Sequence, residues 1–253
     1  MSKEPVILVE GASKCYPVQS AAHAGLKKYI LNLPSRLRHR APRRVFHALK
    51  NISFSVDEGE CLGLMGRNGS GKSTALSLIA GVIRPDEGRV TTRGRICPLL
   101  ELGAGFHPDL TGRENIVLNG VLLGMLRREV QKRSEDIIAF SELGTFIEEP
   151  IRTYSMGMLA RLGFSVAVHL DPQILLVDEI LSVGDAAFQA KCMDRFRQFQ
   201  NRGVTTLFVS HDLATVKAIC NRAILLTHGE MRTNGPVEEA AAYYDRILSG
   251  TAT

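Results

Sequence analysis

The sequence of 253 residues predicts an α/β fold with a mostly parallel core sheet, and three short segments support this prediction. Residues 61–65, 174–177 and 205–210 each have the length and the largely apolar composition of a strand that is buried on both faces. Each is followed at once by glycines or by titratable side chains. Because ligands bind beyond the carboxyl ends of the strands in an open α/β sheet, we expect these polar residues to meet at one edge.

The segment after residues 61–65 has the spacing G-x-x-x-x-G-K-S, and residues 73–80 favour a helix. Glycines leave the backbone N–H groups free to turn toward an anion, and the dipole of the helix adds to the attraction. We expect Lys72 to reach the β- and γ-phosphates of ATP and Ser73 to bind Mg²⁺. The expected phosphate-binding residues are Gly66, Arg67, Asn68, Gly69, Ser70, Gly71, Lys72, Ser73 and Thr74.

Titratable side chains follow the other two apolar segments. Asp178 and Glu179 come directly after residues 174–177. We expect Asp178 to hold Mg²⁺ beside Ser73, and Glu179 to polarise the attacking water, because a carboxylate engaged with Mg²⁺ is a poor proton acceptor. His211 follows the third segment and is expected to contact the γ-phosphate or the water. The predicted catalytic residues are therefore Glu179, His211 and Lys72.

These motifs, taken with three further features, resemble the ATP-binding subunits of ABC transporters over nearly the whole chain. Residues 154–158 stand where that family has its L-S-G-G-Q signature, residues 182–185 resemble its D-loop, and Tyr16 takes the place of the aromatic residue that stacks on adenine. The resemblance implies a P-loop NTPase fold with a small antiparallel β subdomain and a helical lobe at about 102–170. The residues that it adds to the nucleotide site are Tyr16, Ser155, Met156, Gly157, Met158 and Asp185.

The resemblance also implies an assembly. In that family the signature of one subunit closes over the phosphate loop of the other. We therefore expect a head-to-tail homodimer with two ATP molecules, in which Ser155 and the N–H group of Gly157 bind the γ-phosphate in trans. Closure would complete each site, and hydrolysis with phosphate release would open it.

Departures from the common ABC pattern indicate a particular branch of the family. Met156 and Met158 replace the usual Gly and Gln of the signature, and Glu101 lies near the place of the Q-loop glutamine but one residue out of step. We expect Glu101 to bind Mg²⁺ or water through its carboxylate. Together with residues 110–116 and 183–189, these substitutions resemble the polysaccharide exporters of O-antigen, capsule and teichoic acid, and are most similar to the O-antigen ATPases.

The function implied by this branch is ATP hydrolysis that drives a separate membrane permease for a lipid-linked polysaccharide. We expect the subunit at the cytoplasmic face of the inner membrane, bound peripherally, with a cytoplasmic helix of the permease in a groove near residues 101–114. A soluble ABC ATPase that acts on ribosomes or nucleic acid is the alternative. Such proteins usually contain tandem nucleotide domains or a long coiled-coil insertion, and the sequence has neither.

Composition agrees with a cytoplasmic protein that needs a membrane partner. The five cysteines are scattered without a C-x-x-C pair, which indicates reduced thiols rather than disulfides or a zinc site. No run of 18 apolar residues occurs, and residues 1–5 lack the apolar core of a signal peptide. We expect one nucleotide-binding domain over residues 1–253, with no C-terminal carbohydrate-binding domain.

A basic insertion is expected within residues 11–56, which contain no Asp or Glu. Apolar residues recur at helical spacing between Leu26 and Leu37, so the segment is amphipathic. Two interpretations remain open: contact with an anionic membrane surface, or an insertion whose apolar face packs on its own domain. Nucleic acid is not an expected partner, because the stretch has few aromatic residues and no recognisable binding module. Its cations are Lys14, Lys27, Lys28, Arg36, Arg38, Arg40, Arg43, Arg44 and Lys50.

The remaining pattern predicts further strands and helices. Strands are expected at residues 6–9, 52–56 and 223–227. Helices are expected as a pair from 115 to about 146, then at about 155–170, around Phe188 to Phe199, and at about 236–248.

Overall fold

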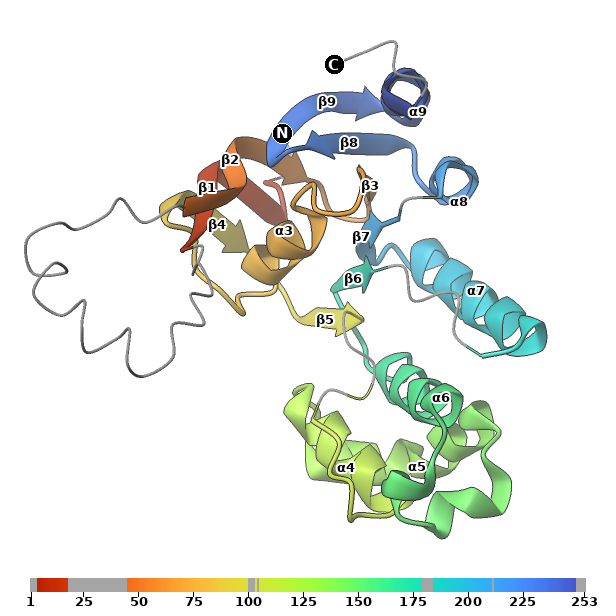
Figure 1. Cartoon of the computed structure of the whole chain (residues 1–253). Helices are drawn as coiled ribbons and strands as arrows, with labels where there is room; N and C mark the ends of the chain where they lie inside the picture. Colours follow the sequence, from red (N-terminus) through yellow and green to blue (C-terminus); the bar gives the residue numbers. More distant parts are fainter. Residues whose placement is uncertain are drawn as a thin grey trace, which may run out of the picture.

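The computed structural model of the chain describes residues 4–17, 45–99, 103, 105–178, 184–210 and 212–248. Two sheets form its framework (Figure 1). The larger sheet has five parallel strands and one antiparallel edge strand, in the order β5 (Ile96–Leu99), β6 (Ile174–Asp178), β7 (Thr205–Val209), β3 (Cys61–Met65), β8 (Arg222–Thr227) and β9 (Glu230–Pro236). The smaller sheet is antiparallel, in the order β2 (Val45–Val56), β1 (Ile7–Pro17) and β4 (Glu87–Thr92). The predicted α/β fold with a mostly parallel core is confirmed.

Helices cover the larger sheet on both faces. α3 (Lys72–Ile79) lies between the two sheets. The other face packs against the remaining helices, and Figure 1 shows α4, α5 and α6 grouped together as a lobe below the sheet. These elements are α4 (Gly112–Leu122), α5 (Arg127–Ser141), the 3₁₀ turns η1 (Gly144–Glu148) and η2 (Ile151–Thr153), α6 (Met156–Ala167), α7 (Ala186–Asn201), α8 (Leu213–Ile219) and α9 (Val237–Leu248). None of these helices in the described ranges is long and apolar enough to cross a membrane.

Alternating side chains of the central strands divide the core into two layers. In β6, Ile174 and Leu176 point into the layer that contains α3 and the small sheet, while Leu175 and Val177 point toward the helices of the opposite face. All four side chains are at most 1% exposed. Since burial of such a side chain is worth about 1.5–3 kcal/mol, the continuous apolar run fixes β6 in the middle of the molecule.

The small sheet is longer than the sequence predicts. β1 extends well beyond residues 6–9 and β2 begins well before residue 52. The added parts mix polar and apolar residues without regular alternation. The backbone ladder between β1 and β2 holds them, with register irregularities after Val9, Ala12 and Lys14. Most of the expected basic insertion, including Leu26 to Leu37, lies outside the described residues.

Three strands and one helix escape the sequence analysis. β4 is an exposed edge strand without an apolar face, and β9 is a polar edge strand. β5 contains Pro98, which a sheet tolerates at its edge because proline has no N–H group to donate. α8 has only seven residues and gives too short a periodic pattern.

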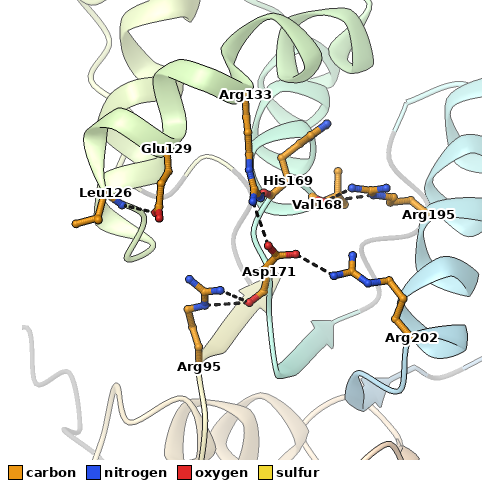
Figure 2. Close-up of polar contacts among 9 residues, drawn as sticks. All are labelled: Arg95, Leu126, Glu129, Arg133, Val168, His169, Asp171, Arg195 and Arg202. Carbon is orange, nitrogen blue, oxygen red and sulfur yellow. Dashed lines mark hydrogen bonds and ion pairs between the residues drawn. The ribbon is translucent and has the colours of Figure 1, made fainter.

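The connection from the helical lobe back to β6 is held by arginines around Asp171 (Figure 2). The Asp171 carboxylate accepts hydrogen bonds from Arg133 of α5 and from Arg202 beyond α7, each at 3.0 Å. The side chain of Arg95, just before β5, donates to the backbone carbonyl of Asp171 at 2.9 Å through Nε. One residue thus joins the lobe, the last turn of α7 and the start of the sheet.

Arg133 and a further arginine, Arg195, also satisfy the end of α6. Arg195 donates to the carbonyl of Val168 at 3.1 and 3.2 Å, and Arg133 donates to the carbonyl of His169 (Figure 2). The last carbonyls of a helix have no partner within the helix, and the negative end of its dipole favours cations there. The arginine cluster therefore fixes the exit of α6 as well as the start of β6.

We expect Asp171→Asn to lower the free energy of unfolding by about 1 kcal/mol at pH 7, because it removes the charge from two partly exposed ion pairs. Arg202 and Arg133 hold the pKa of the Asp171 carboxyl below its usual value. Its stabilisation is therefore present above the unfolded-state pKa of about 3.9 and fades as the pH falls toward the lower folded-state pKa. Urea unfolding in steps from pH 7 to about pH 3 measures both effects.

Asp194→Asn is the matched control. Its carboxylate pairs with Arg197 at 3.3 Å on the exposed surface of α7, so its loss should cost about 0.3 kcal/mol or less. Equal losses for the two variants would contradict a special role for Asp171.

Candidate functional site

The glycine-rich loop joins β3 to α3 and requires its glycines. Gly66 and Gly71 have φ angles of +149° and +109°, in the region that favours glycine. A Cβ atom on Gly66 would lie 2.4 Å from the carbonyl oxygen of Leu226, and one on Gly71 would lie 2.5 Å from that of Ala48. The loop is therefore pressed against neighbouring backbone, and only glycine fits at both positions.

The start of α3 has the features of an anion site. Lys72 is 7% exposed, and its ammonium donates to the carbonyls of Gly66 and Arg67 at 2.7 and 3.2 Å. No described side chain caps the N-terminus of the helix at Gly71, and its first turn has no acidic residue. The Ser70 hydroxyl is buried and has no hydrogen-bond partner among the described residues. Free N–H groups, a cation and an unpaired hydroxyl fit a phosphate group.

A cavity of about 360 Å³ opens on this loop. Asp178, at the end of β6, lines the cavity together with Ser73, so the two expected Mg²⁺ ligands share one space. The parallel strands bring this about, since β6 and β3 both end at the same edge with β7 between them. The lining residues are Phe46, Ala48, Asn68, Gly69, Gly71, Lys72, Ser73, Thr74 and Asp178.

Three expected site residues lie outside the described residues. Glu179 follows Asp178 in the chain, His211 follows Ser210 at the end of β7, and Glu101 follows β5. Their roles remain predictions.

An aromatic pair stands beside the cavity. Tyr16 and Phe46 are directly opposite each other on β1 and β2 and are 39% and 51% exposed. Opposite residues of an antiparallel pair project from the same face, and Phe46 lines the cavity. Tyr16 is predicted from the sequence as an adenine contact, but Phe46 is not, because residue 46 falls within the expected basic insertion. Burial alternates regularly only over residues 52–56 of β2, so no periodic pattern in the sequence marks Phe46 as part of a strand.

The signature segment forms the start of α6. Ser155 is the N-cap, and its hydroxyl accepts a hydrogen bond from the N–H group of Met158 at 3.2 Å. Met156 is 81% exposed, and the first turn has no acidic residue. Among the described residues, a Cβ atom on Gly157 would meet only the Ser155 hydroxyl within 4 Å. These four residues do not line the cavity on the glycine-rich loop of the same chain.

Asp185 is tied to this helix by an arginine that the sequence analysis missed. Its carboxylate caps α7 by accepting from the N–H group of Phe188 at 2.9 Å, and it pairs with Arg161 of α6 at 2.7 Å. The Phe188 amide and the Arg161 guanidinium hold the pKa of Asp185 below its usual value. The guanidinium also lies 4.8 Å from the centroid of the Phe188 ring. The expected D-loop residue and the helix that starts at Ser155 are therefore linked directly.

A second cavity of about 330 Å³ lies between the segment after β5 and the start of α6. Asn115 is fully buried and holds one wall: its side chain accepts from the N–H group of His107 at 2.7 Å and donates to the carbonyl of Thr111 at 2.9 Å. We call this cavity the lobe groove, and its lining residues are Gly103, Phe106, Pro108, Ile151, Arg152, Tyr154, Met156, Leu159 and Ala160.

The turn between β8 and β9 supports the glycine-rich loop from behind. The N–H group of Gly229 donates to the carbonyl of Ser70 at 3.0 Å, and its own carbonyl accepts from the N–H group of Lys50 at 2.8 Å. Gly229 has a φ of +79°, and a Cβ atom there would lie 2.8 Å from the carbonyl oxygen of Ala48. One glycine thus connects the loop to β2.

Comparison with known proteins agrees with this geometry. The sequence profile described as ABC transporter matches residues 49–182. An O-antigen export system ATP-binding protein RfbB of Klebsiella pneumoniae is 51% identical, covering 97% of this chain and 99% of that protein. The teichoic acids export ATP-binding protein TagH of Bacillus anthracis is 44% identical, covering 80% of this chain and 37% of that protein.

Solved structures agree in fold. The ATP-binding cassette MJ0796, described as dimeric in a post-hydrolysis state bound to ADP and Pi, matches with a TM-score of 0.70 at 23% identity, covering 91% of this chain and 98% of that chain. A structure described as the ATP binding subunit of an ABC transporter has a TM-score of 0.73 at 21% identity, covering 97% of this chain and 94% of that chain.

We expect Gly229→Ala to destabilise the fold by about 2–4 kcal/mol and to weaken nucleotide binding, because the new methyl group combines backbone strain with a clash against Ala48. Gly203→Ala is the control, since Gly203 has a similar φ of +75° but no described atom within 4 Å of an added Cβ atom. It should cost roughly 1 kcal/mol. Thermal unfolding and binding of a fluorescent ATP analogue measure the two effects. Equal losses in the two variants would show that strain alone matters.

Proposed function

The chain belongs to the ABC transporter family, and we propose that it hydrolyses ATP to drive export of a lipid-linked, O-antigen-like polysaccharide through a separate permease. The observation that carries this proposal is the cavity of the glycine-rich loop, where Lys72, Ser73 and Asp178 meet. The 51% identity to an O-antigen export protein over nearly the full length of both chains supports the choice of substrate.

Binding of the triphosphate would use fixed backbone groups and one cation. The N–H groups at the start of α3 and the Ser70 hydroxyl are placed to receive phosphate oxygens, and Lys72 would exchange its two loop carbonyls for the β- and γ-phosphates. The Ser73 hydroxyl and the Asp178 carboxylate would hold Mg²⁺, which neutralises phosphate charge when bound. Because these groups are positioned before the ligand arrives, little reorganisation is needed during the reaction.

Water activation is assigned to the residues that follow the strands. Glu179 is adjacent to Asp178 in the chain, but consecutive residues of an extended segment point in opposite directions. We assign Glu179 as the group that polarises the attacking water and His211 as a contact to the γ-phosphate. Glu101 would bind Mg²⁺ or water from the segment after β5.

The adenine would stack on the aromatic pair of Tyr16 and Phe46. Both rings are substantially exposed, which is costly for large apolar side chains unless a ligand covers them. An aromatic ring provides a flat face for a base, and each such stack is worth about 1–3 kcal/mol. Two rings from paired strands fix the position of this face better than one ring from a strand end.

A second copy of the chain would complete each site. Ser155, the N–H group of Gly157 and the start of α6 offer a second anion-binding surface that is separate from the cavity of the same chain. In a head-to-tail dimer this surface would meet the γ-phosphate held by the partner. Met156 and Met158 flank it, and the contact between Arg161 and Asp185 would link its position to the D-loop.

The lobe groove would receive a cytoplasmic helix of the permease. Its lining combines apolar side chains with Arg152, and Asn115 holds its wall rigid. Docking there would place the ATPase peripherally at the cytoplasmic face of the inner membrane. The relatives RfbB and TagH are described as export proteins, and neither description supports the alternative of a soluble ATPase that acts on ribosomes or nucleic acid.

We expect Glu179→Gln to reduce ATP turnover by roughly 100-fold or more, because the amide cannot accept a proton from water. The variant should still bind ATP and form ATP-dependent dimers, which size-exclusion chromatography with light scattering detects. Lys72→Ala is the contrasting variant, since loss of the cation should weaken nucleotide binding itself, by roughly tenfold or more. Normal steady-state hydrolysis by Glu179→Gln would refute the assignment.

We expect the chain to co-purify with a membrane-spanning protein from detergent-solubilised membranes, and lipid-linked polysaccharide to accelerate phosphate release by that complex. Arg152→Glu should weaken the association, because it reverses a charge in the lobe groove. Arg127→Glu, at the exposed start of α5, is the matched control. Recovery of ribosomal or nucleic-acid material in place of a membrane protein would support the soluble alternative.

A further inference from the structure

We infer that Cys15 is a thiol-modification site: its sulfur, paired with the His47 imidazole, reacts with low-molecular-weight disulfides, and the resulting mixed disulfide weakens nucleotide binding. The reaction at Cys15 is independent of the proposed function. The effect on nucleotide affinity rests on it.

The first observation is the geometry of the pair. Cys15 and His47 are directly opposite each other on β1 and β2, and Sγ of Cys15 lies 3.1 Å from Nδ1 of His47. The register between β1 and β2 shifts just before Cys15, so that Ala48 is left without an opposite residue. Such irregularities re-aim side chains and occur often beside functional sites. The thiol is half-buried and the imidazole is exposed, so a small molecule can reach both.

The second observation is the contrast with the other four thiols. Cys97, Cys192 and Cys220 are at most 2% exposed. Burial raises the pKa of Cys97 and of Cys192 to about 12, so these thiols are almost never ionised. Cys61 is partly exposed, but its sulfur lies 3.5 Å from that of Cys220 in the core. Cys15 combines access to solvent with a proton acceptor.

The reaction is a thiol–disulfide exchange. As Sγ of Cys15 attacks one sulfur of a glutathione-type disulfide, Nδ1 of His47 takes the thiol proton. The S–S bond of the reagent breaks, and the departing thiolate takes the proton from His47. One disulfide is consumed, one mixed disulfide forms and one thiol is released, so no further oxidant is needed.

The charges around the pair are balanced. Asp86 accepts a hydrogen bond from the N–H group of Cys15 at 2.6 Å, and a lone carboxylate there would disfavour a thiolate. Its charge is paired with Lys14 at 2.8 Å. Lys14 therefore offsets the repulsion that the Asp86 carboxylate would exert on negative charge at Sγ of Cys15.

The effect on nucleotide binding follows from the neighbouring residue pair, Tyr16 and Phe46. Tyr16 is adjacent to Cys15, and Phe46 is adjacent to His47, so the aromatic pair and the thiol pair occupy opposite faces of the same strand ends. A tripeptide attached to Sγ cannot keep the contact with His47 and would separate the two strand ends. The stacking face for adenine would be lost, and we expect nucleotide affinity to fall roughly tenfold.

Mass spectrometry after brief exposure of the native chain to oxidised glutathione tests the site. One adduct at Cys15 is expected, at a rate that falls about tenfold in His47→Gln. Cys61→Ser is the matched control and should leave the rate unchanged. Faster modification of any other cysteine, or an unchanged rate in His47→Gln, would overturn the assignment of the pair.

Binding of a fluorescent ATP analogue to the purified adduct tests the consequence. The adduct should bind about tenfold more weakly than untreated protein, while Cys15→Ser treated in the same way should bind like untreated protein. Equal binding by adduct and untreated protein would overturn the inference and leave the proposed function intact. Failure of untreated protein to bind the analogue would instead refute the proposed function.

Discussion

An anion site at the start of α3 requires backbone N–H groups that stay free and point to one place. Contacts from several parts of the molecule hold the loop in the conformation that allows this. Gly66 and Gly71 can adopt the required angles only because they carry no Cβ atom, and neighbouring carbonyls occupy the space that a Cβ would need. Those carbonyls belong to β8 and β2, and the turn at Gly229 bonds to the loop from a third direction. The loop is therefore rigid without any side-chain cap. A rigid, uncapped helix start is a site where an anion gains the most from fixed dipoles.

The large sheet fixes the position of Asp178, the side chain that we propose as a ligand of Mg²⁺. Asp178 ends β6, whose alternating side chains are locked into two core layers. The other end of the strand is fixed by Asp171 and its arginines, which also hold α5, the end of α6 and the approach to β5. The helical lobe therefore contacts the start of β6 through charged groups that are partly exposed, while the strand itself lies in the core. Contacts of this kind are individually weak, because exposed ion pairs exchange readily with water.

The sequence alone predicts those parts of the structure that depend on one strong local signal. The strands around Leu64, Leu176 and Leu207 are continuous apolar runs, and the glycine-rich loop has a spacing that only its backbone geometry explains; the predicted fold and the resemblance to the O-antigen exporter branch are both confirmed. The sequence does not predict strands that form through backbone pairing with a neighbour rather than through a pattern of apolar side chains. β4 and β9 are polar edges, and β2 extends outward to Phe46 through residues whose burial does not alternate. The contact between Arg161 and Asp185 joins residues that are 24 positions apart, so no local sequence pattern predicts it.

Two surfaces proposed to bind phosphate, the cavity at the glycine-rich loop and the start of α6, are separate within one chain. This separation is the strongest argument for a dimer. Among the described residues, none from α6 lines the cavity at the glycine-rich loop, while the start of α6 has no acid in its first turn and an exposed methionine. Each surface alone would bind phosphate weakly, because water competes on the uncovered side. Facing each other across a two-fold axis, they would exclude that water and strengthen every charged contact between them. If two chains complete each site in this way, hydrolysis would depend on assembly, and assembly would be the step that a transporter couples to movement of its membrane partner.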